Sequence, residues 1–328
     1  MEPTPATGRE RAHAETFGIE PWVFSRDVPE TIQTLAPALR QFEEERGSDD
    51  EILEQFTSVY RPEKIKADLA EVHRREKAFE ASDDRDARMN LLYATVLELI
   101  VQDASHEWFP DCTIWRATKF DDYCRGTDLF MDIPGPGGEP LTLAVDVTCS
   151  RARTSKKLRD TMQEFRSGRF HTVEYFVSDT DDARARGRVS MPRVVLGASY
   201  HAITRAARVY GQWRRHAAVG SGYTKAEALE RLRYSDIGGQ LYEQLIHQVQ
   251  AAYECIKELL DSTQDKNGTR ADFLRMRGQY LFSVQRSLEE RYRAWEKSRN
   301  TYIEHHKDIA PELAVPSNSV LDVIMHEA

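Results

Sequence analysis

Three acidic side chains stand where a carboxylate is costly unless it has a partner or a task. Glu98 is the only charged residue in the apolar stretch 91–101, Asp128 follows a bend at Gly126, and Asp146 lies inside an apolar strand-like segment. A buried carboxylate needs an ion-pair partner, a metal or a shared polar pocket. Carboxylates from two adjacent strands and from a helix behind them can bind Mg²⁺ or Mn²⁺, with water and a substrate phosphate completing the coordination.

A metal held in this way can activate water and neutralise charge while a phosphodiester is attacked. A nearby lysine would orient the water or stabilise the developing charge. Lys156 and Lys157 follow the second strand-like segment, at the start of a predicted helix. Their side chains point about 100° apart on that helix, so only one can face Asp146. Lys157 is preferred, because Leu158 and Met162 then point toward the sheet and Lys156 lies nearer to solvent.

A sheet flanked by helices must position these residues. Residues 83–104 are predicted to form a helix with an acidic first turn and a nearly all-round apolar second half. Residues 127–133 and 141–149 are predicted strands, and the short Pro/Gly-rich connection 134–140 favours an antiparallel hairpin. Alternation in the second strand puts the Leu/Val stripe on one face and Asp146 on the other.

The rest of the chain is predicted to surround this hairpin with helices and two more strands. A helix over 154–167, ended by Gly168, precedes strands at 173–178 and 192–198, and an arginine-rich helix covers 200–216. Apolar residues at three- and four-residue spacing beyond Gly220 predict a long helical hairpin, packed on itself, on the sheet or on another subunit. The fold class is therefore α/β, with a mixed sheet.

The expected organisation has five parts. They are a flexible tail (1–27), a polar helical region broken at 47–48 and 61–62 (28–82), an α/β core (83–220), the C-terminal helical hairpin (221–310) and a C-terminal tail (311–328).

The order Glu98, then Gly126-Thr127-Asp128, then Val145-Asp146-Val147-Thr148, then Lys157 resembles the PD-(D/E)XK nuclease superfamily. The resemblance spans roughly residues 85–200. It implies a restriction-endonuclease-like core of helix, three strands, helix and strand, with 113–117 as the first strand. It also implies a metal-dependent nuclease, in which Asp128 and Asp146 bind the metal and Glu98 completes or supports the site.

Two details of the resemblance concern positions next to these residues. The family lysine lies two positions after the second acid, where this chain has Thr148, so the resemblance implies a lysine moved to the following helix, at Lys156 or Lys157. The chain is also similar to uncharacterised members with an Asp-Asp pair ahead of the two acids, which would be Asp121-Asp122 here.

Each acid also has a purely structural interpretation. Asp128 can cap the turn at Gly126, Asp146 can pair with an arginine from 183–216, and Glu98 can be partly exposed at a helix edge. If these interpretations hold, the chain is a catalytically inactive nucleic-acid-binding protein or an oligomeric assembly protein joined through its C-terminal helices.

Charge is uneven along the chain. The whole sequence has 45 basic and 54 acidic residues, a net charge of −9, yet residues 183–226 contain no Asp or Glu. We expect this stretch to flank the metal site and to contact the phosphates of a nucleic acid, with DNA as the expected partner. The proposed contacts are Arg205, Arg208, Arg214 and Arg215. The competing interpretation pairs these arginines with the acidic residues 43–54.

Composition excludes several other classes of protein. No apolar run reaches the roughly 18 residues of a membrane span, and the N-terminus lacks the apolar stretch of a secretory signal. Four cysteines without a C-x-x-C pair predict a cytoplasmic protein with no disulfide framework and no zinc spacing. No phosphate-binding glycine loop is present, so nucleotide hydrolysis is not expected.

Overall fold

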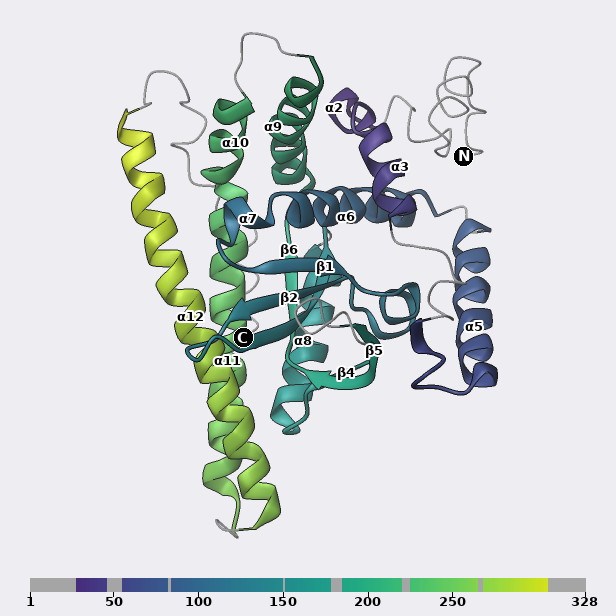
Figure 1. Ribbon diagram of the computed structural model, residues 1–328, viewed down its shortest axis with the longest axis vertical. Helices are drawn as coiled ribbons and strands as arrows, with labels where there is room; N and C mark the ends of the chain where they lie inside the picture. The colour runs from purple at the N-terminus through teal and green to yellow at the C-terminus, as the bar shows by residue number, and fades with distance from the viewer. Residues whose placement is uncertain are drawn as a thin grey trace.

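A four-stranded mixed sheet forms the centre of the computed structural model, which describes residues 28–45, 55–81, 84–149, 151–177, 185–219, 225–264 and 268–305 (Figure 1). The strand order is β1-β2-β3-β6. Neighbours are antiparallel except β3 and β6, which are parallel. The strands are β1 (Thr113–Arg116), β2 (Leu129–Pro134), β3 (Pro140–Thr148) and β6 (Arg193–Gly197). The mixed α/β class and the antiparallel hairpin predicted from the sequence are confirmed.

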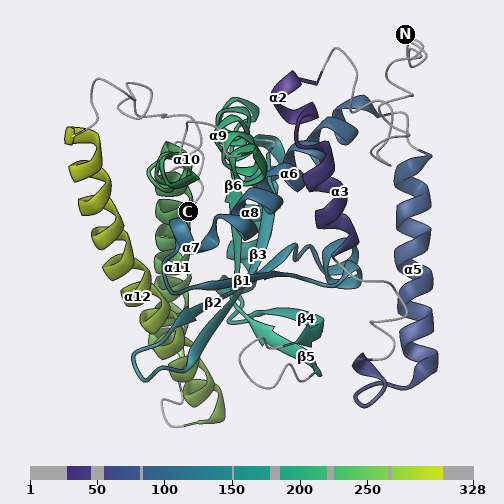
Figure 2. The ribbon, with the colours of Figure 1, turned by 45° about the horizontal axis from the view of Figure 1, so that its top comes forward.

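The two faces of β3 separate as its alternation predicts. Leu141, Leu143, Val145 and Val147 belong to the main apolar core, whereas Ala144 packs with Phe130 and with residues of β4 and β5 on the other face. Helix α6 (Arg85–Asp103) covers the main-core face and crosses the strands (Figure 2). Asp84 caps this helix by accepting a hydrogen bond of 2.9 Å from the Ala87 N–H. The predicted helix over 83–104 is confirmed.

Helix α8 (Arg151–Arg166) makes the crossover that a parallel β3–β6 pair requires. Gly168 follows it at φ 70°, the left-handed conformation that ends many helices. Before β6 the chain forms β4 (His171–Val177) and β5 (Ala185–Met191), an antiparallel pair in a separate sheet. The strand predicted at 173–178 therefore exists, but it lies outside the main sheet.

The remaining helices pack on the sheet or on other helical elements. The N-terminal ones are α2 (Glu30–Gln33), α3 (Ala36–Glu44) and α5 (Pro62–Glu80), and a five-residue π-helix η2 (Asp121–Arg125) precedes β2. After β6 come α9 (Tyr200–Val219), α10 (Lys225–Arg233), α11 (Asp236–Ser262) and α12 (Thr269–His305). The predicted tails 1–27 and 311–328 lie outside the described residues.

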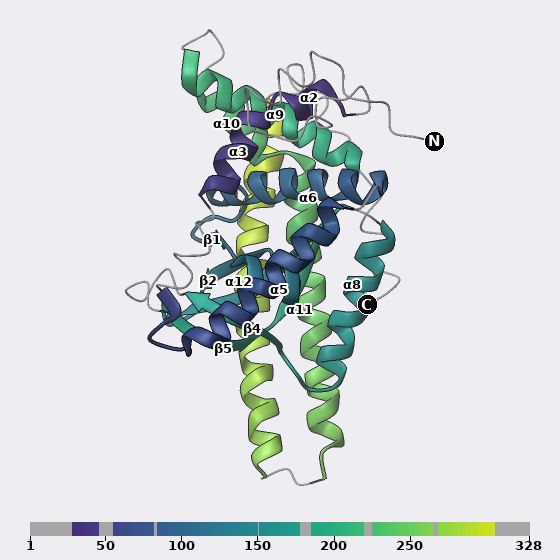
Figure 3. The same cartoon turned by 90° about the vertical axis from the view of Figure 1, so that its right-hand side faces the viewer.

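The predicted C-terminal hairpin is present as α11 and α12, two long helices that run side by side (Figure 3). It packs on itself and, through α11, on β6 and α8. Neither helix, nor any other in the described ranges, combines the length and the apolar character needed to cross a bilayer.

The free edge of β6 is covered by two glutamines one turn apart on α11. The Gln248 side chain accepts from the Val195 N–H (2.8 Å) and donates to the Val195 carbonyl (2.7 Å). Gln244 makes the same pair of bonds with Gly197, each 2.8 Å long. Both glutamines are almost fully buried. They satisfy four backbone groups that a neighbouring strand would otherwise bond.

Replacing both glutamines with leucine is expected to destabilise the fold by at least about 3 kcal/mol. Each buried backbone group left without a partner costs about 1–3 kcal/mol. Urea unfolding of the double variant, compared with Gln250→Leu at an exposed position of the same helix, measures the effect. Equal stability of the two variants would show that the edge of β6 does not depend on these side chains.

Candidate functional site

The strand register brings Asp128 and Asp146 together. Leu129 pairs with Val145, so Asp128, one residue earlier, lies opposite Asp146. The Asp128 N–H donates to the Val145 carbonyl (2.9 Å), and its carboxylate accepts from the Val147 N–H. The two residues are only 8% and 1% exposed. Two carboxylates from adjacent strands therefore share a site with little access to water.

The turn before Asp128 depends on a glycine. Gly126 ends η2 at φ 70°, a conformation that side chains with a Cβ rarely adopt. A Cβ placed here would lie 3.6 Å from Asp146 Oδ2 and 3.8 Å from Arg193 Nη1. The bend thus carries the chain past the Asp146 carboxylate and directly into β2.

The two acids of η2 have different surroundings. Asp121 is fully buried and accepts hydrogen bonds from the Glu174 and Tyr175 N–H groups at 2.7 and 2.8 Å, so it fastens β4 to η2. Asp122 instead lines the cavity described below, together with Asp128. Only the second member of the Asp121-Asp122 pair therefore reaches the candidate site.

Lys157, and not Lys156, meets the acids. Its ammonium donates to Asp146 Oδ1 and, at 3.4 Å, to the Val147 carbonyl. Lys156 is 75% exposed and pairs with Asp160 on its own helix. Burial lowers the pKa of Lys157, but Asp146, Asp128 and Glu98 raise it, and the net shift is upward. Lys157 is therefore held as a cation among the carboxylates.

Glu98 completes the acidic cluster from α6. It is 7% exposed, so the interpretation that it lies partly exposed at a helix edge is wrong. Burial raises the pKa of Asp128 well above its usual range, and the charges of Glu98, Asp122 and Asp146 raise it further, while Lys157 opposes them. The pKa of Asp146 is also raised by burial, although Lys157 and Arg193 lower it. A cation beside Asp128 would relieve this mutual repulsion.

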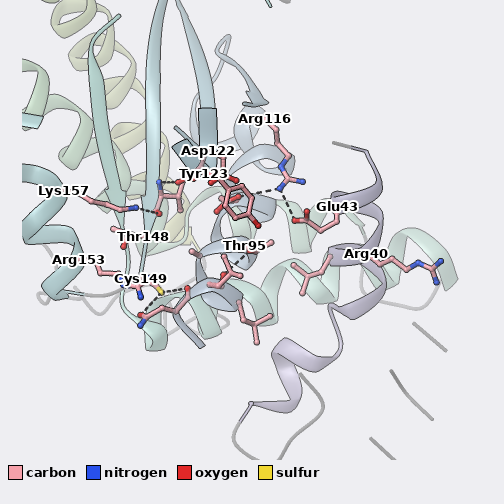
Figure 4. Close-up of a pocket in the computed structure, with 18 of the residues that line it drawn as sticks. Arg40, Glu43, Thr95, Arg116, Asp122, Tyr123, Thr148, Cys149, Arg153 and Lys157 are labelled. Atoms are coloured by element: carbon pink, nitrogen blue, oxygen red, sulfur yellow. Dashed lines mark hydrogen bonds and ion pairs between the residues drawn. The ribbon is translucent and has the colours of Figure 1, made fainter. Parts of the chain in front are cut away.

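A cavity of about 730 Å³ opens beside these groups, between α3, α6, η2 and α8 (Figure 4). Glu98, Asp122, Asp128 and Lys157 supply its charged inner wall. Asp146 is not in the cavity wall but lies behind it, paired to Lys157. The rest of the lining includes Leu39, Arg40, Glu43 and Glu44 of α3, Leu91, Leu92, Ala94 and Thr95 of α6, and Arg116, Tyr123, Thr148, Cys149 and Arg153.

Arg116 is a cavity residue that the sequence did not single out. Its guanidinium stacks on the Phe42 ring (3.8 Å), donates to the Phe42 carbonyl (2.7 Å) and to Glu43 (3.0 Å), and lies 4.0 Å from Glu98. The only sequence signal was its place in the predicted first strand. Arg116 joins α3 to the acidic wall.

The arginines expected to bind nucleic acid lie elsewhere. Arg205 pairs with Asp236 (3.5 Å), and Arg214 pairs with Asp103 (3.5 Å) and bonds Gln41 (3.0 Å). Arg208 is exposed on α9. None of these three lines the cavity, because α9 packs against α6 on the far side from the sheet (Figure 1).

The pairing of these arginines also differs from the competing interpretation. Arg205 and Arg214 pair with Asp236 and Asp103, outside the segment 43–54. Residues 46–54 and the side chain of Arg215 lie outside the described part of the chain. Arg193, also from the acid-free stretch, does act on the site, since its charge lowers the pKa of Asp146.

The donor chemistry of the site fits a hard divalent cation. No group of three His, Cys, Asp or Glu side chains within the described ranges is arranged as a metal cluster. Mg²⁺, however, takes only one or two carboxylates and keeps several waters. Asp128 and Glu98 offer oxygen donors to the cavity, and Asp146 would have to share its carboxylate with Lys157.

Comparisons with known proteins identified no relative of this chain. No protein-family model matches it, and neither a search of curated proteins nor a search of solved structures gave a significant match. The geometry of Asp128, Asp146, Glu98 and Lys157 is therefore the basis for any assignment of function.

Proposed function

We propose that this protein is a metal-dependent nuclease that hydrolyses phosphodiester bonds. DNA is the proposed substrate, and defence or mobile-element biology is the proposed context. The observation that carries the proposal is the contact of Lys157 with Asp146, the acid that the register places beside Asp128. In this proposal, Lys157 of α8 takes the role of the lysine that is missing at Thr148.

The topology supports a restriction-endonuclease-like core of the PD-(D/E)XK type. Helix α6, strands β1 to β3, helix α8 and strand β6 follow one another in the order that the resemblance implies. Further elements interrupt this order: α7 (Ser105–Trp108) between α6 and β1, η2 between β1 and β2, and the β4–β5 pair, which stands between α8 and β6 in the chain and outside the main sheet.

In this proposal each side chain has a defined task. Asp128 and Asp146, supported by Glu98, would hold Mg²⁺ or Mn²⁺, which when bound supplies water activation and neutralisation of phosphate charge. Lys157 stays protonated between the acids and can donate a hydrogen bond to a phosphate oxygen as negative charge grows on it. Asp146 orients Lys157, and the Val147 N–H fixes the Asp128 carboxylate.

The direct test is strand scission by the purified protein. Supercoiled plasmid, single-stranded DNA and RNA are incubated with Mg²⁺, Mn²⁺ or EDTA. We expect cleavage with either metal and none with EDTA. Absence of cleavage for all substrates and both metals would reject the nuclease assignment.

One observation favours a second candidate, a nucleic-acid-binding protein without catalysis. The buried Asp146 carboxylate is committed to an ion pair with the half-buried Lys157, an arrangement that can serve the fold alone. This candidate predicts retention of nucleic acid without scission. Assembly through the C-terminal helices remains a further proposal, for which Phe273, Met276 and Phe282 are exposed apolar residues on α12.

A cytoplasmic location is proposed on the basis of the cysteines. All four, at positions 112, 124, 149 and 255, are free thiols in the fold, which suits a reducing compartment.

Phosphate contacts are expected from Arg153 at the cavity and not from Arg208 on α9. Both side chains are exposed, but only Arg153 lines the cavity. Arg153→Gln should weaken DNA binding several-fold and lower the slope of log affinity against log salt by about one, whereas Arg208→Gln should change neither. Binding isotherms at two salt concentrations measure both variants. A larger loss of DNA affinity in Arg208→Gln than in Arg153→Gln would show that the phosphate contacts lie on α9.

A further inference from the structure

We propose that the cavity beside Asp128 receives an unpaired nucleotide, so that the substrate is single-stranded nucleic acid and not intact duplex. The inference rests on the proposed nuclease function, because the same carboxylates mark the place of the scissile phosphate. It adds that the strand must be unpaired where it binds.

The size of the cavity is the first argument. About 730 Å³ is the volume of a small-molecule pocket, which typically spans about 300–1,000 Å³. One or two nucleotides fit such a space, whereas a double helix, in which every base is stacked and paired with a second strand, does not. Asp128 and Glu98 are more than nine-tenths buried, so a phosphate must enter the cavity to reach them. A strand still paired to its complement cannot follow.

Part of the cavity lining has the chemistry of a base-binding surface. Leu91, which is 42% exposed, and Ala94 of α6 contribute apolar surface, and the more deeply buried Leu39 and Leu92 lie beside them, while α3 also brings Glu43 and Glu44 to the lining. Figure 4 shows the Tyr123 ring near the middle of the lining side chains, with Lys157 on one side and Glu43 on the other. Apolar and aromatic side chains stack on the faces of unpaired bases, as in enzymes that act on flipped or single-stranded nucleotides. In a duplex these faces are already stacked.

Contacts between α3 and the rest of the fold hold one side of the cavity in place. Leu39 and Phe42 of α3 are buried in the main core, and Arg116 stacks on Phe42 while bonding its carbonyl and Glu43. Moving α3 outward to admit a duplex would break all of these contacts. The fold therefore holds this wall against the sheet.

The test measures binding separately from cleavage. The Asp128→Asn protein with Mg²⁺ is titrated against a short labelled DNA strand and against the same strand in a duplex, by fluorescence anisotropy. We expect the single strand to bind at least about tenfold more tightly. Adding Tyr123→Leu should weaken single-strand binding about tenfold, while Tyr123→Phe should retain it, since the ring supplies the stacking. Val59→Gln, at an exposed apolar position outside the cavity lining, should have no effect.

The outcomes distinguish this inference from the nuclease proposal. Equal affinity for strand and duplex, or unchanged binding in a folded Tyr123→Leu variant, overturns the inference. Wild-type protein that cleaves duplex as fast as single strand also overturns it but leaves the nuclease assignment standing. Tight single-strand binding without cleavage by the wild type supports the inference and rejects the nuclease.

Discussion

Asp128→Asn is expected to lose cleavage by about a thousandfold and to melt at a higher temperature than the wild type when no metal is present. Cleavage falls because the variant lacks a charged oxygen ligand beside the phosphate. Stability rises because burial and the charges of Glu98, Asp122 and Asp146 oppose ionisation of Asp128, and asparagine carries no charge. Its side-chain oxygen can still accept from the Val147 N–H. Cleavage rates and thermal melting in EDTA measure the two effects.

Asp132→Asn is the matched control for this prediction. Asp132 is also buried and lies in β2, but its carboxylate accepts from the Thr142 hydroxyl and is not part of the cavity wall. The control should keep its cleavage rate. If Asp128→Asn cleaves as fast as this control, Asp128 has no part in the chemistry.

Lys157→Met is expected to reduce cleavage by about a hundredfold or more, whereas Lys156→Met should stay within about twofold of the wild type. The two lysines are adjacent in sequence and identical in charge, so a difference between the cleavage rates of the two variants reports the position of each side chain. Lys157 touches Asp146, and Lys156 pairs with Asp160 in solvent. Single-turnover cleavage rates of the two variants make the comparison. Small, equal losses would mean that neither lysine is catalytic and that nothing replaces the lysine missing at Thr148.

The part of the site that could be predicted rests on local periodicity. Alternation in 141–149 placed Asp146 on the face opposite the Leu/Val stripe, and the short 134–140 connection fixed the hairpin that sets Asp128 beside it. The helical period of α8 separated Lys157 from Lys156. These patterns extend over ten to twenty consecutive residues, so they can be recognised in the sequence without knowledge of the tertiary contacts.

The remainder depends on contacts between distant segments. Strand β5 reads ARGRVSM, with little apolar alternation, and it forms because β4 offers a partner edge. Arg116 meets α3 only after folding, and Arg205 and Arg214 find acids at Asp236 and Asp103, about 30 and 110 positions away. An arginine-rich helix with no acids of its own looked like a phosphate-binding face for this reason. Its ion pairs instead join it to acids on other helices.

The central claim is that this cluster of acids cuts nucleic acid with the help of a metal. The most direct measurement is the rate of plasmid scission by wild type and Asp146→Asn, purified in parallel and assayed with Mg²⁺ and with EDTA. The account predicts scission only by the wild type and only with Mg²⁺, with a residual rate in the variant at least about a hundredfold lower. Equal scission by the two proteins, or scission that persists in EDTA, would contradict it.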